Sequence, residues 1–201
     1  MSEIITNAEE KKQAYINLLR SSGREGIDNL IEYLESKTDF FTAPASTKYH
    51  NNFEYGLLLH SLNVYDNFKK LLAMRPEIKV EEDTAIIVSL CHDLCKANFY
   101  TIEKRNRKNE NGQWESYETY ATIKSPTLPY PHSTRSIRIL RSFIRISHLE
   151  ELMIFYHMGP FGGEDYEYRN LLQDVNERYP ATLLFYMADL ISSYLDEEKK
   201  L

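Results

Sequence analysis

Residues 85–96 read AIIVSLCHDLCK, and this stretch decides the fold that the sequence predicts. Its first half is apolar or small on every side, so the helix that it forms should lie buried at the centre of a helical bundle. The stretch then runs directly into His92 and Asp93. A buried carboxylate costs several kcal/mol unless it is paired, hydrogen-bonded or bound to a metal, so Asp93 needs a partner.

Two other helices offer side chains of a suitable kind. Over residues 56–74, apolar residues recur at steps of three and four and His60 falls on their face, so this histidine should point into the core. A final helix over about residues 181–195 is strongly apolar yet carries Asp189 in the middle of its apolar run. Imidazole and carboxylate groups suit a transition metal, so we expect three helices to converge on one ion. Taken alone, each histidine is also explained by an ordinary core or surface position.

The remaining helices are predicted from their spacing and their end signals. Two of them, over residues 8–21 and 27–36, precede the central stretch and are separated by a glycine-containing break. Asp83 is the predicted N-terminal cap of the central helix. A helix over about residues 148–158 should place His157 in its last turn.

A β-hairpin is predicted between the helices, over about residues 98–124. Strand-forming residues flank Asn111 and Gly112 there, which is the strongest short-range signal for a hairpin. The two prolines within residues 127–132 exclude a helix in that segment. His132 should then lie at the entrance of a helix that is capped by Ser133 or Thr134 and runs to about Ile146.

The bulk properties are those of an ordinary globular chain of 201 residues. We expect one domain over residues 1–201, with N-terminal helices in residues 1–42 and a helical core in residues 43–195. No apolar run has the length of a membrane span and the first residues lack the apolar stretch of a signal peptide, so we expect no membrane association and a cytoplasmic location. The net charge of −6 argues against a protein that coats nucleic acids.

The order of the chemically active residues is the most specific feature of the sequence. It runs His60, His92-Asp93, His132, His157, Asp189. This order resembles that of the HD superfamily of metal-dependent phosphohydrolases, H…HD…H…H…D, over residues 43–195. Residues 54–64, EYGLLLHSLNV, look like the family's first-histidine helix, and His92-Asp93-Leu-Cys-Lys96 is similar to its HDxxK form. Residues 43–50, APASTKYH, look like the HD domain of a bacterial 3′-5′ exoribonuclease group and its phage relatives.

The resemblance implies a mainly α fold, an HD-domain helical bundle with a small inserted β-hairpin, and a dinuclear metal site. One metal would be held by His60, His92, Asp93 and Asp189, and Asp93 would bridge to a second held by His132 and His157. Mixed imidazole and carboxylate ligands favour two divalent ions of Mn, Fe, Co, Zn or Ni, with Mg also allowed. A metal-bridged hydroxide would then attack phosphorus, which makes Asp93 a predicted catalytic residue.

Lys96, Arg135 and His50 are the predicted substrate contacts. Lys96 follows Asp93 by three residues on the same helix face, and it would act in catalysis by holding a phosphate oxygen. The alternative for Lys96 is a solvated lysine that complements the helix dipole. His50 is expected to line the same pocket.

Basic residues form two groups that bear on the substrate. Arginines at positions 135, 138, 141 and 145 make a stripe along one helix edge, which either guides a polyanion to the metals or is a solvated face. Basic residues at positions 104, 105, 107 and 108 lie near the hairpin tip beside aromatic residues. They either contact nucleic acid or form an ordinary solvated tip.

The function expected first is a phosphohydrolase or phosphodiesterase that acts on a small-molecule nucleotide, a cyclic nucleotide or a short oligonucleotide. A second hypothesis is a mixed-valent di-iron oxygenase of the HD fold, similar to myo-inositol oxygenase, because such enzymes use the same ligand set. A third is a non-catalytic nucleotide-binding module, against which the complete ligand set argues. The bound metal discriminates between the first two, and the sequence leaves the substrate, the metal and the oligomeric state open.

Overall fold

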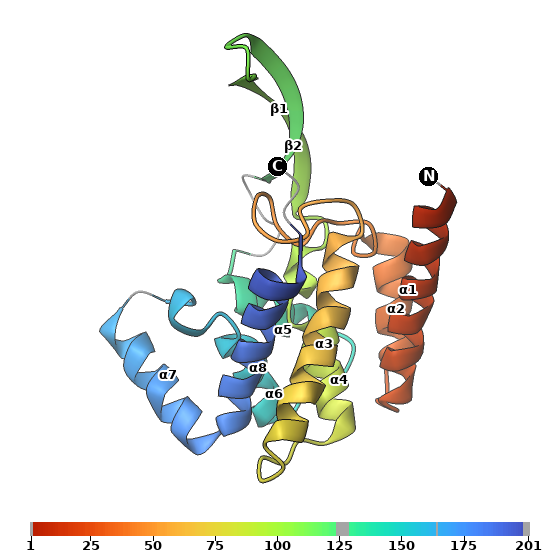
Figure 1. Ribbon diagram of the computed structural model, residues 1–201. Coiled ribbons are helices and arrows are strands. Elements are labelled where there is room, and N and C mark those ends of the chain that lie inside the picture. Colours follow the sequence, from red (N-terminus) through yellow and green to blue (C-terminus); the bar gives the residue numbers. More distant parts are fainter. Residues whose placement is uncertain (1, 124–128, 164, 199–201) are drawn as a thin grey trace.

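The structure, a computed structural model, describes residues 2–123, 129–163 and 165–198. In these ranges the chain is mainly helical with one two-stranded antiparallel sheet (Figure 1). The helices are α1 (Ser2–Ser21), α2 (Ile27–Lys37), α3 (Gly56–Met74), α4 (Glu82–Cys91), α5 (His132–Arg141), α6 (His148–Tyr156), α7 (Tyr166–Arg178) and α8 (Pro180–Ile191). The other elements are the short helical turns η1 (Leu94–Lys96), η2 (Gly159–Phe161) and η3 (Ser192–Asp196) and the strands β1 (Tyr100–Lys108) and β2 (Trp114–Thr122). The prediction of a mainly helical fold with a small hairpin is confirmed.

Helix α4 lies at the centre of the helical body, as its sequence predicts. Its residues from Thr84 to Cys91 are all buried, and the helix contacts α1, α3 and α6. Each buried Leu or Ile side chain contributes about 1.5–3 kcal/mol, which offsets the cost of the polar residues that follow. Helix α3 packs against both α4 and α8, so the three helices expected to converge do lie side by side (Figure 1).

The sequence pattern did not predict helix α7. Most of its residues are charged or polar, and only Leu172 and Val175 are buried. These two pack with Tyr156 in a small cluster that is separate from the main core. A helix that buries so narrow a stripe gives a weak periodic signal. No described helix has the length and apolar character needed to cross a membrane.

Helix α5 begins one residue before the predicted caps. It starts at His132 directly after Pro131, and neither Ser133 nor Thr134 caps it. Proline has a fixed φ and no N–H, so it suits the position just ahead of a helix and sets the start here. The segment predicted as non-helical, residues 127–132, begins outside the described residues, and its described part up to Pro131 is not helical.

Helix α5 also ends earlier than predicted, at Arg141 rather than near Ile146. The chain turns there so that the Ile144 side chain is buried in the main core. The backbone carbonyl of Phe143 then lies against Gly26, where a Cβ atom would overlap its oxygen. Gly26 has a φ of +87°, a conformation that glycine adopts without strain.

Strands β1 and β2 form the predicted hairpin, which projects from the helical body (Figure 1). They pair residue for residue along their whole length. The loop is closed by the N–H of Asn109, which donates to the carbonyl of Gln113 at 2.8 Å, and Gly112 has a φ of +76°. Residue 124, the end of the predicted range, lies outside the described residues.

Three of the four basic residues of the hairpin contact neighbours on the hairpin itself. Arg107 forms an ion pair with Glu115 at 2.6 Å and lies over the ring of Tyr117. Lys108 lies over the ring of Trp114. Four glutamates balance the four basic residues between positions 98 and 123, so this segment has no net charge to attract nucleic acid.

A buried ion pair joins the turn after α1 to α6. The side chain of Glu150 is fully buried, binds the guanidinium of Arg24 and accepts a hydrogen bond from the Thr84 hydroxyl at 2.9 Å. Its other oxygen completes a capping box at the start of α6. Arg24 also binds Asp83, at 2.8 Å. The prediction that Asp83 caps α4 is therefore wrong, because α4 begins at Glu82 and Asp83 serves this ion pair instead.

We predict that Glu150→Ala lowers the free energy of unfolding by about 3 kcal/mol, because it leaves the Arg24 charge without its buried partner. Glu151→Ala is the matched control, since the adjacent Glu151 pairs with Arg141 at the surface and such pairs contribute about 0–1 kcal/mol. Urea denaturation followed by circular dichroism measures both variants. Equal losses in the two would contradict this account of the ion pair.

Candidate metal centre

Asp93 occupies the turn where helix α4 ends. The helix stops at Cys91, and Asp93 has a φ of −108° and a ψ of 20°, outside helical geometry, before η1 begins. Backbone conformations in this sparsely populated region recur at active sites. Only 2% of Asp93 is exposed, so its carboxylate lies inside the bundle and depends on its neighbours for stabilisation.

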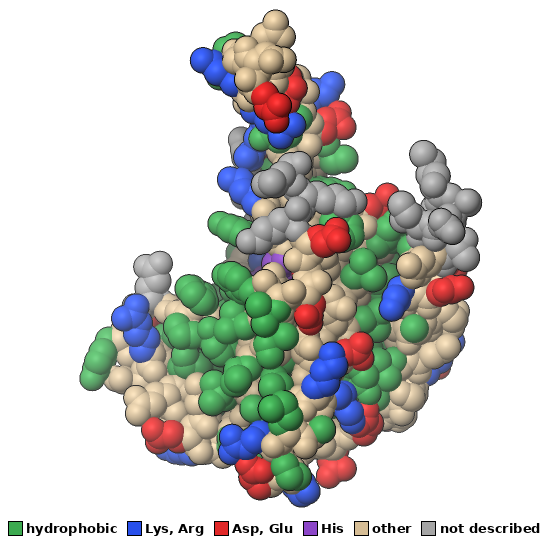
Figure 2. Space-filling model, viewed as in Figure 1, with side chains coloured by type: hydrophobic (Ala, Val, Ile, Leu, Met, Phe, Trp, Pro, Cys, Tyr) green, Lys and Arg blue, Asp and Glu red, His purple; other side chains and the backbone are tan. Residues whose placement is uncertain are grey.

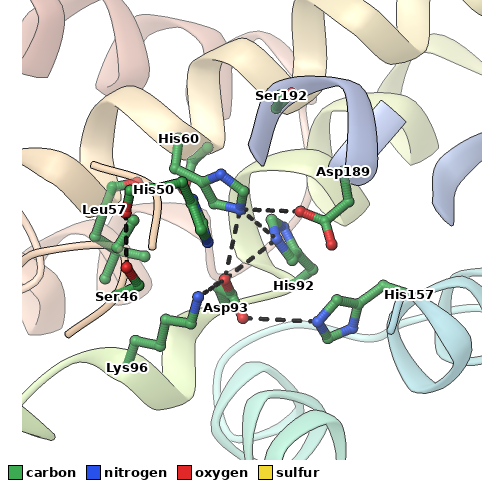
Figure 3. Close-up of polar contacts among 12 residues, drawn as sticks. Ser46, His50, Leu57, His60, His92, Asp93, Lys96, His157, Asp189 and Ser192 are labelled. Atoms are coloured by element: carbon green, nitrogen blue, oxygen red, sulfur yellow. Dashed lines mark hydrogen bonds and ion pairs between the residues drawn. The ribbon is translucent and has the colours of Figure 1, made fainter. Parts of the chain in front are cut away.

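One oxygen of Asp93 faces the side chains predicted to hold the first metal. Its Oδ2 atom lies 3.4 Å from Nε2 of His92 and 3.6 Å from Nε2 of His60. Asp189 on α8 adds a second carboxylate, since its Oδ1 atom lies 3.2 Å from the same His60 nitrogen. The Nζ atom of Lys96 lies 2.7 Å from Oδ2. These side chains point toward one another from α3, α8 and the end of α4 (Figure 3).

The other oxygen of Asp93 faces a second pair of imidazoles. Its Oδ1 atom lies 2.6 Å from Nε2 of His132 at the start of α5, and 3.7 Å from Nε2 of His157 directly after α6. The centroids of these two rings are 5.3 Å apart. The structure thus brings all six predicted ligands together, in two groups that share Asp93.

Backbone carbonyls place a proton on Nδ1 of two of the imidazoles. The Nδ1 atom of His92 donates to the carbonyl of Ser89 at 2.9 Å, and that of His157 donates to the carbonyl of Ile154 at 2.7 Å. A neutral ring that donates from Nδ1 presents a lone pair at Nε2, the atom that faces Asp93. Nε2 of His157 is buried without a hydrogen-bond partner in the described part of the chain. A metal ligand fits an orphaned nitrogen of this kind.

Electrostatic interactions favour the protonation states that a metal requires at His157, Asp93 and Asp189. Burial is the largest cause that lowers the pKa of His157, to about 3, so this ring is neutral at pH 7. Burial raises the pKa of Asp93, but the positive charge of Lys96 and the nearby histidines outweigh it and hold that pKa well below its usual range. Burial likewise raises the pKa of Asp189, and its contact with His60 reverses the shift. Both carboxylates are therefore ionised.

Glu197 holds His60 from the side opposite to Asp93. Its Oε1 atom lies 3.0 Å from Nδ1 of His60, and its Oε2 atom lies 2.6 Å from Nδ1 of His50. Burial lowers the pKa of His60, but the carboxylates of Glu197 and Asp189 outweigh burial and raise it to about 10. A carboxylate behind a metal-binding imidazole fixes the orientation of the ring and increases its basicity.

The sequence did not point to Glu197, because this residue lies beyond the predicted core and in a polar C-terminal stretch. The turn η3 continues α8 and packs against α3, which brings Glu197 back to the histidines. The one available signal was the rule that a metal-binding histidine donates its second nitrogen to an oxygen, and this rule does not identify which oxygen. His50, a predicted substrate contact, lies in the same cavity as the metal residues.

Cys95 is a second neighbour of the site that the sequence did not reveal. Its Sγ atom lies 3.0 Å from Nδ1 of His132, and its backbone N–H donates to the hydroxyl of Ser136 at 3.1 Å. The thiol therefore supports the His132 ring on the side away from Asp93. Cys95 and Cys91 are both free thiols. Cys95 lies beside the site, and Cys91 lies in the core.

The centre opens into a cavity of about 380 Å³. Polar and aromatic side chains both line it. The polar lining residues include Asp93, Lys96, His132, His157 and Asp189, and the aromatic ones include Tyr49, Phe161 and Tyr186. Outside the cavity, apolar side chains gather over α7 and α8, beside a hollow near the base of the hairpin where a histidine is visible (Figure 2).

Arg135 does not line this cavity. Its guanidinium lies over the ring of Phe99, 4.6 Å from the centroid, in a different cavity. The next two arginines of the stripe are also engaged, since Arg138 lies over Tyr130 and Arg141 pairs with a glutamate. Of the three predicted substrate contacts, the structure places Lys96 and His50 beside the metal residues and Arg135 elsewhere.

Comparison of the chain with protein-family models, with curated proteins and with solved structures finds no match. The resemblance to the HD superfamily therefore stays a prediction from the order of the residues. What the structure adds is geometry: buried His, Asp, Glu and Cys side chains lie in groups that are able to hold a metal ion.

We predict that Glu197→Gln lowers the affinity for Mn²⁺ about 10–100-fold, because the imidazole of His60 loses its carboxylate partner. Glu198→Gln is the matched control, since the adjacent Glu198 is exposed and its backbone carbonyl, which the substitution keeps, accepts from the N–H of Asn51. Isothermal titration calorimetry measures both affinities. If the two variants bind Mn²⁺ equally well, Glu197 has no part in the site.

Proposed function

We propose that the chain is a metal-dependent phosphohydrolase of the HD type that hydrolyses a phosphodiester or phosphomonoester of a nucleotide, a cyclic nucleotide or a short oligonucleotide. The observation that carries the proposal is the position of the Asp93 carboxylate between two sets of side chains. Its two oxygens face two separate groups of imidazoles. A bridging carboxylate between two metal ions requires this arrangement, whereas a histidine that only satisfies the core does not.

The two groups would hold two divalent ions. The first set is His60, His92, Asp93 and Asp189, and the second is Asp93, His132 and His157. Such mixed donors favour Mn²⁺, Fe²⁺, Co²⁺, Ni²⁺ or Zn²⁺ over Mg²⁺. When bound, a pair of divalent ions supplies Lewis acidity toward a phosphate and lowers the pKa of water.

Lys96 is the residue of this chain best placed to bind a phosphate oxygen. Its ammonium lines the cavity and lies 2.7 Å from Oδ2 of Asp93. Burial lowers the pKa of Lys96, but Asp93 outweighs burial and raises it, so the side chain is charged at neutral pH. A compact, charged donor of this kind stabilises negative charge that develops on the phosphate.

The cavity favours a small or single-stranded substrate. Its volume of about 380 Å³ lies near the lower end of ligand pockets, which range over about 300–1,000 Å³. The rings of Tyr49 and Phe161 are largely exposed at its edge, where a base is able to stack on them. The balanced charge of the hairpin and the position of Arg135 in a different cavity provide no basic track for a long polyanion among the described residues.

The test combines metal analysis of the purified protein with an anaerobic, Mn²⁺-supplemented assay on bis(p-nitrophenyl) phosphate and on short RNA and DNA oligomers. We expect two metal ions per chain. We expect Asp93→Ala to lose metal and to lower kcat/KM at least ~10³-fold, because several kcal/mol of charge stabilisation is removed. Asp174→Ala is the control, since Asp174 pairs with Arg178 at the surface.

Three outcomes would contradict the proposal. A protein without bound metal that is not activated by Mn²⁺ has no such centre. Hydrolysis that persists in Asp93→Ala is carried out elsewhere on the chain or by a contaminant. Two bound irons without hydrolysis of any phosphate ester would favour the oxygenase that uses the same ligand set.

A further inference from the structure

A second cavity lies on the other side of the chain segment that carries Asp93. Its volume is about 700 Å³, and none of its described lining residues also lines the metal cavity. The wall includes Cys95 in the middle of η1 and Ala97 directly after it, together with one face of helix α5. The two cavities therefore flank the same short segment and the same helix.

The second cavity carries positive charge without a matching negative charge. Arg135, Arg138 and Arg141 line it, and no carboxylate is present among its described lining residues. Arg141 has a partner outside the lining, Glu151, at 2.6 Å. Arg138 is exposed, and the ring of Tyr130 is its neighbour, 4.3 Å from the guanidinium carbon to the centroid. Two guanidinium groups, those of Arg135 and Arg138, are thus available to an anion.

Arg135 is the unusual member of this group. Its exposed fraction is 9%, and its Nε atom is buried without a hydrogen-bond partner in the described ranges. Its neighbour is the ring of Phe99, which offers a cation–π contact but no negative charge. Burial of a guanidinium charge without a carboxylate costs free energy, so an anion that enters the cavity would stabilise this side chain. Guanidinium groups bind phosphate through two parallel hydrogen bonds.

Much of the rest of the wall is apolar, although two polar side chains also line it. The rings of Tyr33 and Phe143 lie with their centroids 5.0 Å apart and their planes tilted by 35°, and both line the cavity with Ile139 and Ile123. A small inorganic anion would leave this surface in contact with water. A ligand with a planar apolar body covers the rings while its anionic end reaches the arginines, as in most small-molecule sites, where a few polar groups orient an apolar ligand.

We propose that this cavity is a second binding site, separate from the metal centre, for a nucleotide-like ligand in which a phosphate monoester is joined to a planar ring system. Arg135 and Arg138 lie one turn apart on α5 and bind the phosphate. The ring system packs against Tyr33 and Phe143. The site binds its ligand without hydrolysing it, because no metal-ligating group of the centre lines it.

The test is isothermal titration calorimetry with the methylene phosphonate analogue of adenosine 5′-monophosphate, which resists hydrolysis. Wild type is compared with Arg135→Gln and Arg138→Gln. The control is Arg178→Gln, since Arg178 is an exposed arginine on α7 that pairs with Asp174. Any binding in the metal cavity is common to all four proteins, so the difference between them isolates the second cavity. Adenosine and inorganic phosphate are titrated in parallel.

We expect both cavity variants to lose one binding event or to weaken it at least tenfold, while Arg178→Gln binds like wild type. We expect adenosine not to bind at this site and inorganic phosphate to bind it more weakly than the analogue. Arg138→Gln keeps the test valid if the buried Arg135 is needed for folding. Unchanged binding in Arg138→Gln would overturn the proposal, and so would adenosine that binds as tightly as the analogue.

Discussion

The carboxylate of Asp93 has both of its oxygens inside the helical body, and the rest of the structure depends on how they are stabilised. A charge at this depth is tolerated only where positive or metal partners surround it. Lys96 meets one oxygen and His132 meets the other, with further imidazoles close behind. Several features of the fold assemble these partners around one side chain. They are the central position of α4, the break after Cys91 and the approach of α3, α5, α6 and α8.

The parts of the fold that were predictable from sequence are those with strong periodic signals. The apolar run of α4 and the histidine on the buried face of α3 led directly to the centre of the bundle. Helix α7 was not predictable, because it buries too few residues to show a period. Glu197 and Cys95 were missed for a different reason: they act through His60 and His132, and no local pattern shows which distant oxygen or sulfur will lie behind a given ring.

The basic residues show why composition alone says little about the substrate. The arginines after His132 look like one stripe in the sequence, yet helix α5 directs His132 into the metal cavity and Arg135 into the other. The cations of the hairpin are balanced by glutamates on the same element. The cavities themselves carry positive charge at Lys96 in the metal cavity and at Arg135 and Arg138 in the second. The proposed ligands of both cavities are therefore small phosphorylated molecules rather than a long nucleic acid.

The most direct test of the central claim is anomalous diffraction from crystals grown with Mn²⁺. The account predicts two anomalous peaks, each in contact with a different oxygen of Asp93. One should lie among His60, His92 and Asp189, and the other between His132 and His157. A single peak that leaves one of these groups empty, or no peak at Asp93, would contradict the claim that this carboxylate bridges two metal ions.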